Sequence, residues 1–310
     1  MRKIAITHGY EDKDRIAKIA AAAPGFELVF GEDVSDCEVV FGHLNPEQVK
    51  STSKLKWLHA QSAGVDHYLL PEYALPESVI LTNSAGMHGI SIAEHLLAFT
   101  LMLMRRMHSY VYQQPTHKWE YLGNVQSVYQ SIITVVGLGG IGSQYAMRCK
   151  ALGAIVRGVA RNPKECEYVD EMYTTNQLDE AIKDADVVAL ILPNTAETAG
   201  LFSRERMLKM KKGSFILNAG RGSAIDQDAM IELLESGHLG GAGLDVTSPE
   251  PLPTDSKLWD LPNVILTPHI SGGGSLAITT EMIFDRFIGY LQDYVEGKPF
   301  EKVVDKKAGY

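Results

Sequence analysis

The sequence has few cysteines and none of the cysteine or histidine spacings that bind metal ions. Its three cysteines, Cys37, Cys149 and Cys166, cannot all pair. Disulfide-stabilised domains and zinc sites carry more cysteines, at short regular spacings. We therefore predict reduced thiols, no metal site and a cytoplasmic protein.

The chain also lacks a membrane-length hydrophobic run and an excess of basic residues. Its longest apolar stretch, residues 92–104, contains Glu94 and His95 and is too short to cross a bilayer. Residues 1–7 are basic but lack the apolar core of a signal peptide. The 29 Lys and Arg residues against 38 Asp and Glu give a net charge of −9, which repels phosphate backbones. We expect neither a membrane nor a nucleic acid as partner.

What the chain does have is enough ordinary globular sequence for two domains. It contains 310 residues, of which 45% are hydrophobic and 22% charged. In the first ninety residues, short apolar runs of strand length alternate with segments of helical periodicity such as 12–23. The predicted strands are 3–7, 27–30, 38–41, 55–60 and 79–82. Such alternation predicts a parallel sheet covered by helices on both faces.

The same alternation resumes after residue 131 and ends in a long helix over about 275–296. Six strands are predicted there: 132–136, 155–159, 187–192, 214–218, 241–246 and 264–266. We predict an α/β protein of two domains. A Rossmann-type doubly wound parallel sheet, residues 91–281, is inserted into a smaller flavodoxin-like substrate domain formed by residues 1–90 and 282–310. The cleft between two such domains is the natural place for a ligand.

A helix over residues 91–107 is predicted between the two domains. Ser91 and Glu94 have the spacing of a capping box, which would start the helix. Its body is apolar almost all the way round, so every side should be buried. Burial against a second subunit would make the protein a homodimer, and burial within one chain is the alternative.

The strand at 132–136 leads into a glycine-rich turn, Gly137-Leu138-Gly139-Gly140-Ile141-Gly142. A helix-like segment, 143–152, and a second strand follow, which is the context of a dinucleotide-binding fingerprint. Gly137 permits the tight turn, Gly139 lets backbone amides approach a pyrophosphate, and Gly142 lets the helix pack on the sheet. The turn therefore predicts a bound dinucleotide at the helix N-terminus.

Three polar motifs follow strands of the second domain, at 218–222 (NAGRG), 245–251 (DVTSPEP) and 267–273 (TPHISGG). With these motifs, the chain resembles the D-isomer-specific 2-hydroxyacid dehydrogenases, which include glyoxylate/hydroxypyruvate reductases and phosphoglycerate dehydrogenase. The resemblance covers nearly the whole chain. It implies that Arg221, Glu250 and His269 form the catalytic trio.

These residue types suit hydride transfer beside a carboxylate. The reaction makes or consumes an alcohol proton, and a histidine such as His269 exchanges protons near neutral pH. A carboxylate such as Glu250 favours the charged imidazole. The guanidinium of Arg221 can hold a 2-oxo acid through two parallel hydrogen bonds.

The resemblance also implies further binding residues. The loop Ala63-Gly64-Val65 would bind the substrate carboxylate through its backbone amides, although it could instead be an ordinary turn. Leu192 and Pro193 would lie beside the cofactor. Asp245 would hydrogen-bond the nicotinamide carboxamide.

The end of the second Rossmann strand predicts the cofactor. NAD-dependent enzymes normally place an acid there to bind the ribose 2′-hydroxyl. Here the sequence is Val-Ala-Arg-Asn-Pro-Lys over 159–164, with no carboxylate before Glu165. Arg161 would attract a 2′-phosphate, so we favour NADP over NAD. Arg161 could also be a solvated turn residue or stack on adenine.

The sequence thus predicts an NADP-dependent reductase of small 2-oxo acids. A phosphite-type dehydrogenase of the same fold is an alternative that the trio does not exclude, whereas formate enzymes of this family carry Gln in place of Glu250. A corepressor-like scaffold that senses dinucleotides is a third possibility, which the intact trio disfavours.

Overall fold

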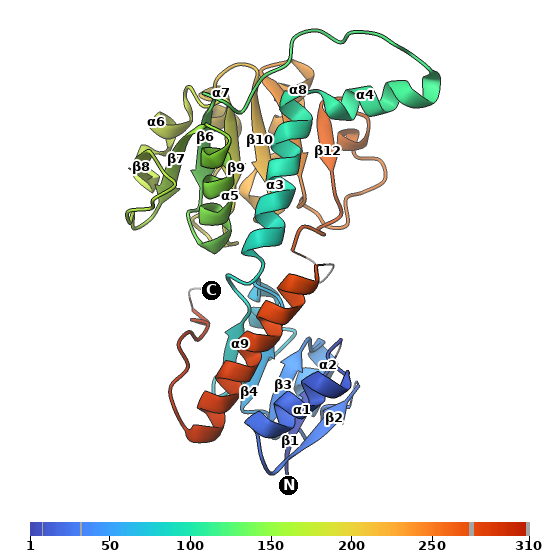
Figure 1. Cartoon of the computed structure of the whole chain (residues 1–310), viewed down its shortest axis with the longest axis vertical. Coiled ribbons are helices and arrows are strands. Elements are labelled where there is room, and N and C mark those ends of the chain that lie inside the picture. The colour runs from blue at the N-terminus through green and yellow to red at the C-terminus, as the bar shows by residue number, and fades with distance from the viewer. Residues whose placement is uncertain (8, 32, 273–275, 308–310) are drawn as a thin grey trace. The chain divides into compact units, whose positions relative to one another are not determined.

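The computed structural model describes residues 1–7, 9–31, 33–272 and 276–307, which form two compact units (Figure 1). Unit 1 comprises Met1–His88 and Gly274–Tyr310, and unit 2 comprises Gly89–Gly273. The predicted boundary at 281/282 falls inside helix α9 (Ala277–Glu296), which the structure keeps whole in unit 1. The predicted start of this helix at Ser275 lies outside the described residues.

Unit 1 is a five-stranded parallel sheet in the order β2-β1-β3-β4-β5, the flavodoxin-like order. Each predicted strand is confirmed, and no end is shifted by more than two residues. The strands are β1 (Arg2–Ile6), β2 (Phe26–Phe30), β3 (Val39–Gly42), β4 (Trp57–Ala60) and β5 (Ile80–Asn83). The helical elements are α1 (Lys13–Ala22), α2 (Pro46–Ser51), the short η1 (Asp66–Leu69) and α9.

Aromatic packing explains why α9 belongs to unit 1. Phe287 of α9 stacks on Phe41 of β3, with ring centroids 4.1 Å apart, and on Trp57 of β4 at 5.6 Å. All three side chains are fully buried. Each aromatic ring removes a large apolar area from water, so this cluster ties the C-terminal helix to the first sheet.

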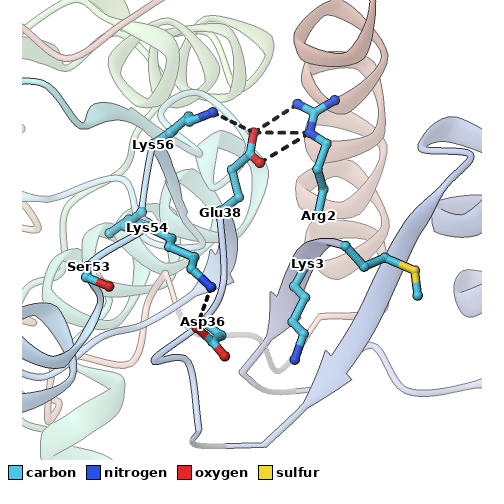
Figure 2. Close-up of a pocket in the computed structure, with 9 residues that line it drawn as sticks. Arg2, Lys3, Asp36, Glu38, Ser53, Lys54 and Lys56 are labelled. Atoms are coloured by element: carbon cyan, nitrogen blue, oxygen red, sulfur yellow. Dashed lines mark hydrogen bonds and ion pairs between the residues drawn. The ribbon is translucent and has the colours of Figure 1, made fainter.

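A pocket at the amino ends of β1, β3 and β4 is lined by charged side chains that already pair with one another (Figure 2). Glu38 accepts a hydrogen bond from Nη2 of Arg2 at 2.9 Å and lies 3.5 Å from Nζ of Lys56. Lys54 pairs with Asp36 at 2.7 Å. Ligands bind at the carboxyl ends of strands in open α/β sheets, which is the opposite edge. We interpret this cluster as structural.

Glu38→Gln is expected to lower the free energy of unfolding at pH 7 by about 2 kcal/mol. The hydrogen bond from Arg2 lowers the pKa of Glu38 from 4.5 to about 2, although burial opposes the shift. A shift of this size corresponds to about 3 kcal/mol. Solvent screening reduces it, because the Arg2 side chain is 48% exposed.

Because the folded-state pKa is depressed, this stabilisation is present above pH 4.5 and is lost as the pH falls toward 2. Urea unfolding at pH 7 and pH 3 checks it. The difference in the free energy of unfolding between wild type and Glu38→Gln should be smaller at pH 3 than at pH 7. The exposed control Glu11→Gln should unfold with the wild-type free energy at both pH values. A difference in unfolding free energy that is the same at both pH values would contradict a stabilising role for the Glu38 charge.

Unit 2 is a seven-stranded parallel sheet in the order β12-β11-β10-β9-β6-β7-β8. Its first six strands have the order of a doubly wound dinucleotide-binding sheet, and β12 extends the edge. The strands are β6 (Ile132–Val136), β7 (Ile155–Ala160), β8 (Glu171–Thr174), β9 (Val187–Leu190), β10 (Ser214–Asn218), β11 (Leu239–Leu244) and β12 (Val264–Leu266). Its α-helices are α3 (Gly89–Met104), α4 (Met107–Gln113), α5 (Gly140–Ala151), α6 (Leu178–Ile182), α7 (Arg204–Leu208) and α8 (Gln227–Glu235). Its short 3-10 helices are η2 (Gln114–Thr116), η3 (Thr175–Gln177), η4 (Gly222–Ala224) and η5 (Lys257–Trp259).

The prediction of six strands was wrong by one. Strand β8 was missed because its sequence, Glu-Met-Tyr-Thr, contains no apolar run. It pairs only with β7 at one edge of the sheet, and none of its residues is fully buried. Edge strands of this kind leave a weak hydrophobic signal.

The predicted helix 91–107 also needs correction at both ends. Helix α3 starts at Gly89, so Ser91 is buried in its first turn and is not a cap. A Cβ at Gly89 would lie 3.2 Å from the carbonyl oxygen of Gly140, which is a close approach that only the fold reveals. Arg106 adopts a left-handed conformation (φ +53°) and separates α3 from α4.

The cysteine prediction agrees with the structure, in which Cys37 and Cys149 are buried and all three thiols are free. Within the described residues there is no cluster of His, Cys, Asp or Glu that could hold a metal ion. The same residues include no helix with the length and apolarity to cross a membrane.

Candidate active site

The glycine turn after β6 has the geometry that its sequence predicts. Gly137 has φ +102°, and a Cβ there would lie 2.2 Å from the carbonyl oxygen of Ile191. At Gly142 a Cβ would lie 2.3 Å from the Gly137 oxygen, so α5 packs tightly on the turn.

Between these two positions the turn is open. Apart from its own chain neighbours, no described residue has a heavy atom within 4 Å of the position of a Cβ at Gly139, which caps α5. Gly140 is exposed. Ile141 is half-buried in the first turn of the helix. Amide groups at an accessible helix N-terminus bind phosphates, so these residues fit a dinucleotide.

The loops after β9, β10 and β11 lie against one another. A Cβ on Gly220 would be 2.5 Å from the backbone nitrogen of Leu192, and one on Gly222 would be 1.9 Å from the oxygen of Thr247. The side chain of Leu192 also lies beside Gly137, and the adjoining Pro193 is exposed. The polar motifs therefore converge at the carboxyl edge that carries the glycine turn.

Asn218 shapes the loop that presents Arg221. The Asn218 side chain is buried; its Nδ2 donates to the carbonyl oxygen of Arg221 at 2.9 Å, and its Oδ1 accepts from the amide of Gly220 at 3.0 Å. Nη1 of Arg221 donates to the Gly220 oxygen at 2.9 Å. The half-buried guanidinium is thus held beside the sheet edge.

Glu250 and His269 form a pair, as the sequence predicts. Nδ1 of His269 lies 2.9 Å from Oε2 of Glu250, and the other Glu250 oxygen accepts from the Thr247 amide at 3.1 Å. The side chains are 50% and 39% exposed, so substrate can reach them. Since Nδ1 is engaged by the carboxylate, Nε2 is the nitrogen available for proton transfer.

Asp245 lies beneath the segment that carries His269. Its buried carboxylate accepts from Thr267 Oγ1 at 2.6 Å, from the amides of Ile270 and Ser271 at 2.9 and 3.1 Å, and from Ser271 Oγ. Burial raises the pKa of Asp245, but the hydrogen bonds from Ser271, Thr267 and the amides outweigh it and lower the pKa. The group is therefore an anion at neutral pH.

Three residues of this region were missed by the sequence analysis. Thr267 and Ser271 flank the predicted histidine, and their spacing around it was the available signal. His95 on α3 lies 172 residues before Thr267 and contacts its hydroxyl at 2.9 Å. No local pattern marks such a contact.

Arg161 follows the end of β7, as predicted, and its side chain is 57% exposed. It lies 3.6 Å from a carboxylate oxygen of Glu197, which follows β9. The sequence showed no acid near Arg161 because Glu197 is distant in the chain. An exposed ion pair of this kind contributes little energy and can exchange for another anion.

In unit 1, the loop Ala63-Gly64-Val65 follows β4. The Ala63 oxygen accepts from Nδ2 of Asn83 at 2.7 Å, and the Gly64 oxygen accepts from Oγ of Ser62 at 2.8 Å. Of the residues that the structure describes, none accepts a hydrogen bond from the three amides of this loop. A turn with engaged carbonyls and available N–H groups suits an anion.

A doubly wound sheet with an open glycine turn and a His–Glu pair at its carboxyl edge defines a dinucleotide-dependent oxidoreductase. The family model described as "D-isomer specific 2-hydroxyacid dehydrogenase, NAD binding domain" matches residues 97–271. The chain therefore belongs to the D-isomer specific 2-hydroxyacid dehydrogenases, which use NAD(P).

Three relatives illustrate the range of the family. The chain is 37% identical over 222 residues to D-3-phosphoglycerate dehydrogenase of Bacillus subtilis, covering 71% of this chain but only 42% of the longer enzyme. It is 30% identical to glyoxylate/hydroxypyruvate reductase A of Photorhabdus laumondii, covering 85% and 84%. Among solved structures, the NADPH-dependent glyoxylate/hydroxypyruvate reductase of Sinorhizobium meliloti, in complex with NADP and sulfate, superposes with a TM-score of 0.84, 28% identity and complete coverage of both chains.

Proposed function

We propose that the protein interconverts small 2-oxo and 2-hydroxy carboxylic acids with NADP(H) in preference to NAD(H). The observation that carries this proposal is the Glu250–His269 pair, 2.9 Å apart, at the sheet edge that also carries Arg221. An acid/base and a guanidinium at one edge suit a carbonyl beside a carboxylate.

Carbonyl reduction requires a hydride and a proton, which come from different groups. When bound, the nicotinamide cofactor supplies the hydride that reaches the carbonyl carbon. His269, protonated, donates the proton from Nε2 to the carbonyl oxygen, and Glu250 stabilises the imidazolium and fixes the ring through Nδ1. In the oxidation direction His269 takes that proton back.

Substrate binding is assigned to two groups. Arg221 would hold the carboxylate and the carbonyl oxygen with parallel N–H donors, which also polarises the carbonyl. In unit 1, the amides of Ala63, Gly64 and Val65 would bind the negative end of the substrate.

Cofactor binding is assigned to Gly137, Gly139, Gly140, Ile141 and Gly142 for the pyrophosphate, and Leu192 and Pro193 for the nicotinamide side. Arg161 would bind the 2′-phosphate of NADP, because no acid ends β7 and the Sinorhizobium relative binds NADP. The carboxylate of Glu197 would repel the 2′-phosphate, and its ion pair with Arg161 would have to break when NADP binds. Asp245 would hydrogen-bond the nicotinamide carboxamide, and this new bond would replace one of the hydrogen bonds that its carboxylate now accepts.

A steady-state screen tests the proposal. Glyoxylate, hydroxypyruvate and larger 2-oxo acids are offered with NADPH and with NADH, and kcat/KM is measured by the loss of reduced cofactor. We expect turnover of at least one acid, with NADPH preferred about tenfold, a difference of about 1.4 kcal/mol. Arg161→Ala should remove that preference, and the exposed Arg204→Ala should not.

Two results would overturn parts of the proposal. A clear preference for NADH would refute the cofactor assignment. Oxidation of phosphite with NADP⁺, in the absence of any 2-oxo acid reduction, would replace the proposed reaction by a phosphite-type dehydrogenase.

We also propose a homodimer whose contact is formed by exposed apolar side chains of α3, α4 and the loop that follows them. Figure 1 shows the course of these segments. One side of α3 packs on its own unit, with Phe99 and Leu103 buried. The exposed large apolar side chains of this segment are Leu101, Met107, Val111, Tyr112, Trp119, Tyr121 and Val125. If α3 were buried only within its own chain, these apolar side chains would stay exposed to water. A partner subunit that covers them is therefore favoured.

Sedimentation velocity at micromolar concentration is expected to show a dimer. Leu101→Glu with Val111→Glu should shift it toward monomer, since each places a charge in the apolar contact. A wild-type monomer would contradict the proposal.

A further inference from the structure

His95 lies in the second turn of α3 and reaches the edge of the site through a hydroxyl group. Its Nε2 is 2.9 Å from Oγ1 of Thr267, and that hydroxyl donates its own hydrogen to Oδ1 of Asp245 at 2.6 Å. The hydroxyl has only one hydrogen, so Nε2 of His95 must be the donor to it. This fixes the tautomer of His95 as the one with the proton on Nε2.

The surroundings of the His95 ring hold it in position for this contact. Its side chain is 22% exposed, and it packs edge-on against Phe99 with the ring centroids 4.5 Å apart. Burial lowers the pKa of His95, and the charge of Asp245, 3.9 Å away, opposes the shift. The contact is thus one between a neutral donor and a hydroxyl.

Asp245 in turn accepts hydrogen bonds from the backbone of His269 and of the two residues after it. The His269 amide donates to the carbonyl oxygens of Asp245 and Thr267 at 2.9 and 3.0 Å, and the next two amides donate to the Asp245 carboxylate. His269 itself has φ +52°, in the left-handed region. This conformation is unfavourable for a residue that carries a side chain, so hydrogen bonds on both sides must hold it.

We propose that His95 is a positioning residue for His269. By donating to Thr267 it directs the threonine hydroxyl at Asp245, and Asp245 holds the left-handed backbone that presents the catalytic imidazole to Glu250. The assignment rests on the proposed function, in which His269 transfers the proton. It predicts that the N–H donor of His95 matters, and not its bulk alone.

Two substitutions separate the donor from the bulk. His95→Gln keeps an N–H donor near the position of Nε2, whereas His95→Leu keeps bulk and loses the donor. We expect the Leu variant to lower kcat about tenfold with an unchanged KM for NADPH, and the Gln variant to restore most of the loss. His238→Leu is the matched control, because it removes a similar contact from Nε2, 3.1 Å to the Met207 oxygen, elsewhere in unit 2.

A second readout does not depend on turnover. The imidazole Cε1–H signal of His269, assigned by its loss in His269→Ala, should shift and broaden in the Leu variant and match wild type in the Gln variant. If no 2-oxo acid is reduced by wild type, the proposed function fails while this signal still tests the coupling. An unchanged His269 signal in the Leu variant, or a Gln variant as impaired as Leu, would overturn the assignment.

Discussion

Replacement of His269 by alanine is expected to lower kcat for 2-oxo acid reduction about 1000-fold. General acid/base groups contribute roughly 10²- to 10⁴-fold to such reactions. The His269 side chain is half-exposed, and its Nδ1 is held by Glu250. Once the imidazole is removed, Glu250 cannot donate a proton from the position of Nε2. The KM for NADPH should change little, because the glycine turn is left intact.

Glu250→Gln distinguishes the two members of the pair. The Gln oxygen can still accept from Nδ1 of His269, but the charge that favours imidazolium is lost. We expect a loss of about 10- to 100-fold in kcat, smaller than that of the alanine variant. Steady-state kinetics check both variants, with His238→Ala as the control for loss of a distant histidine. Retention of more than a tenth of the activity in His269→Ala would disprove the acid/base assignment.

Arg221→Met is expected to lower kcat/KM about 1000-fold. Two hydrogen bonds from a charged donor are worth about 4 kcal/mol together, which corresponds to that factor. Arg221→Lys should recover only part of the loss, since an ammonium cannot form the same parallel pair of bonds. Asn218 would still shape the loop, so the fold should be preserved.

Kinetics with the best substrate of the screen measure this effect. The exposed Arg204→Met is the control, because Arg204 pairs with Glu232 on the surface. Added guanidinium ion should restore some activity to Arg221→Met and none to the control. A Met variant within fivefold of wild type would remove Arg221 from the substrate site.

The sequence predicted the bounds of three strands of unit 2 without error. Strands β6, β10 and β12 have the predicted bounds, because each contains two or three consecutive apolar residues next to polar or glycine residues that mark its ends. The glycine turn lies in consecutive residues, and each member of the proposed trio lies in a short polar motif after a strand, so local sequence was enough to place them at the carboxyl edge of the sheet. Local pattern was sufficient for these features.

What the sequence could not predict depends on contacts between distant segments. The first residue of helix α3, Gly89, packs against Gly140, 51 positions further along the chain. His95 reaches Thr267, and Glu197 reaches Arg161, across loops of different strands. Strand β8 is defined by its pairing with β7, and its own four residues contain no apolar run. Each of these features becomes visible only when the sheet is assembled.

The most direct test of the account is the fate of the cofactor hydride. NADPH deuterated at the transferring position of C4 is incubated with the enzyme and the best 2-oxo acid, and the hydroxy acid is analysed by mass spectrometry. We expect one deuterium in each product molecule, bound to C2. The His269→Ala and Arg221→Met variants should form this labelled product more slowly, in proportion to their lower rates. NADPH oxidation with no deuterium in the hydroxy acid would contradict the account.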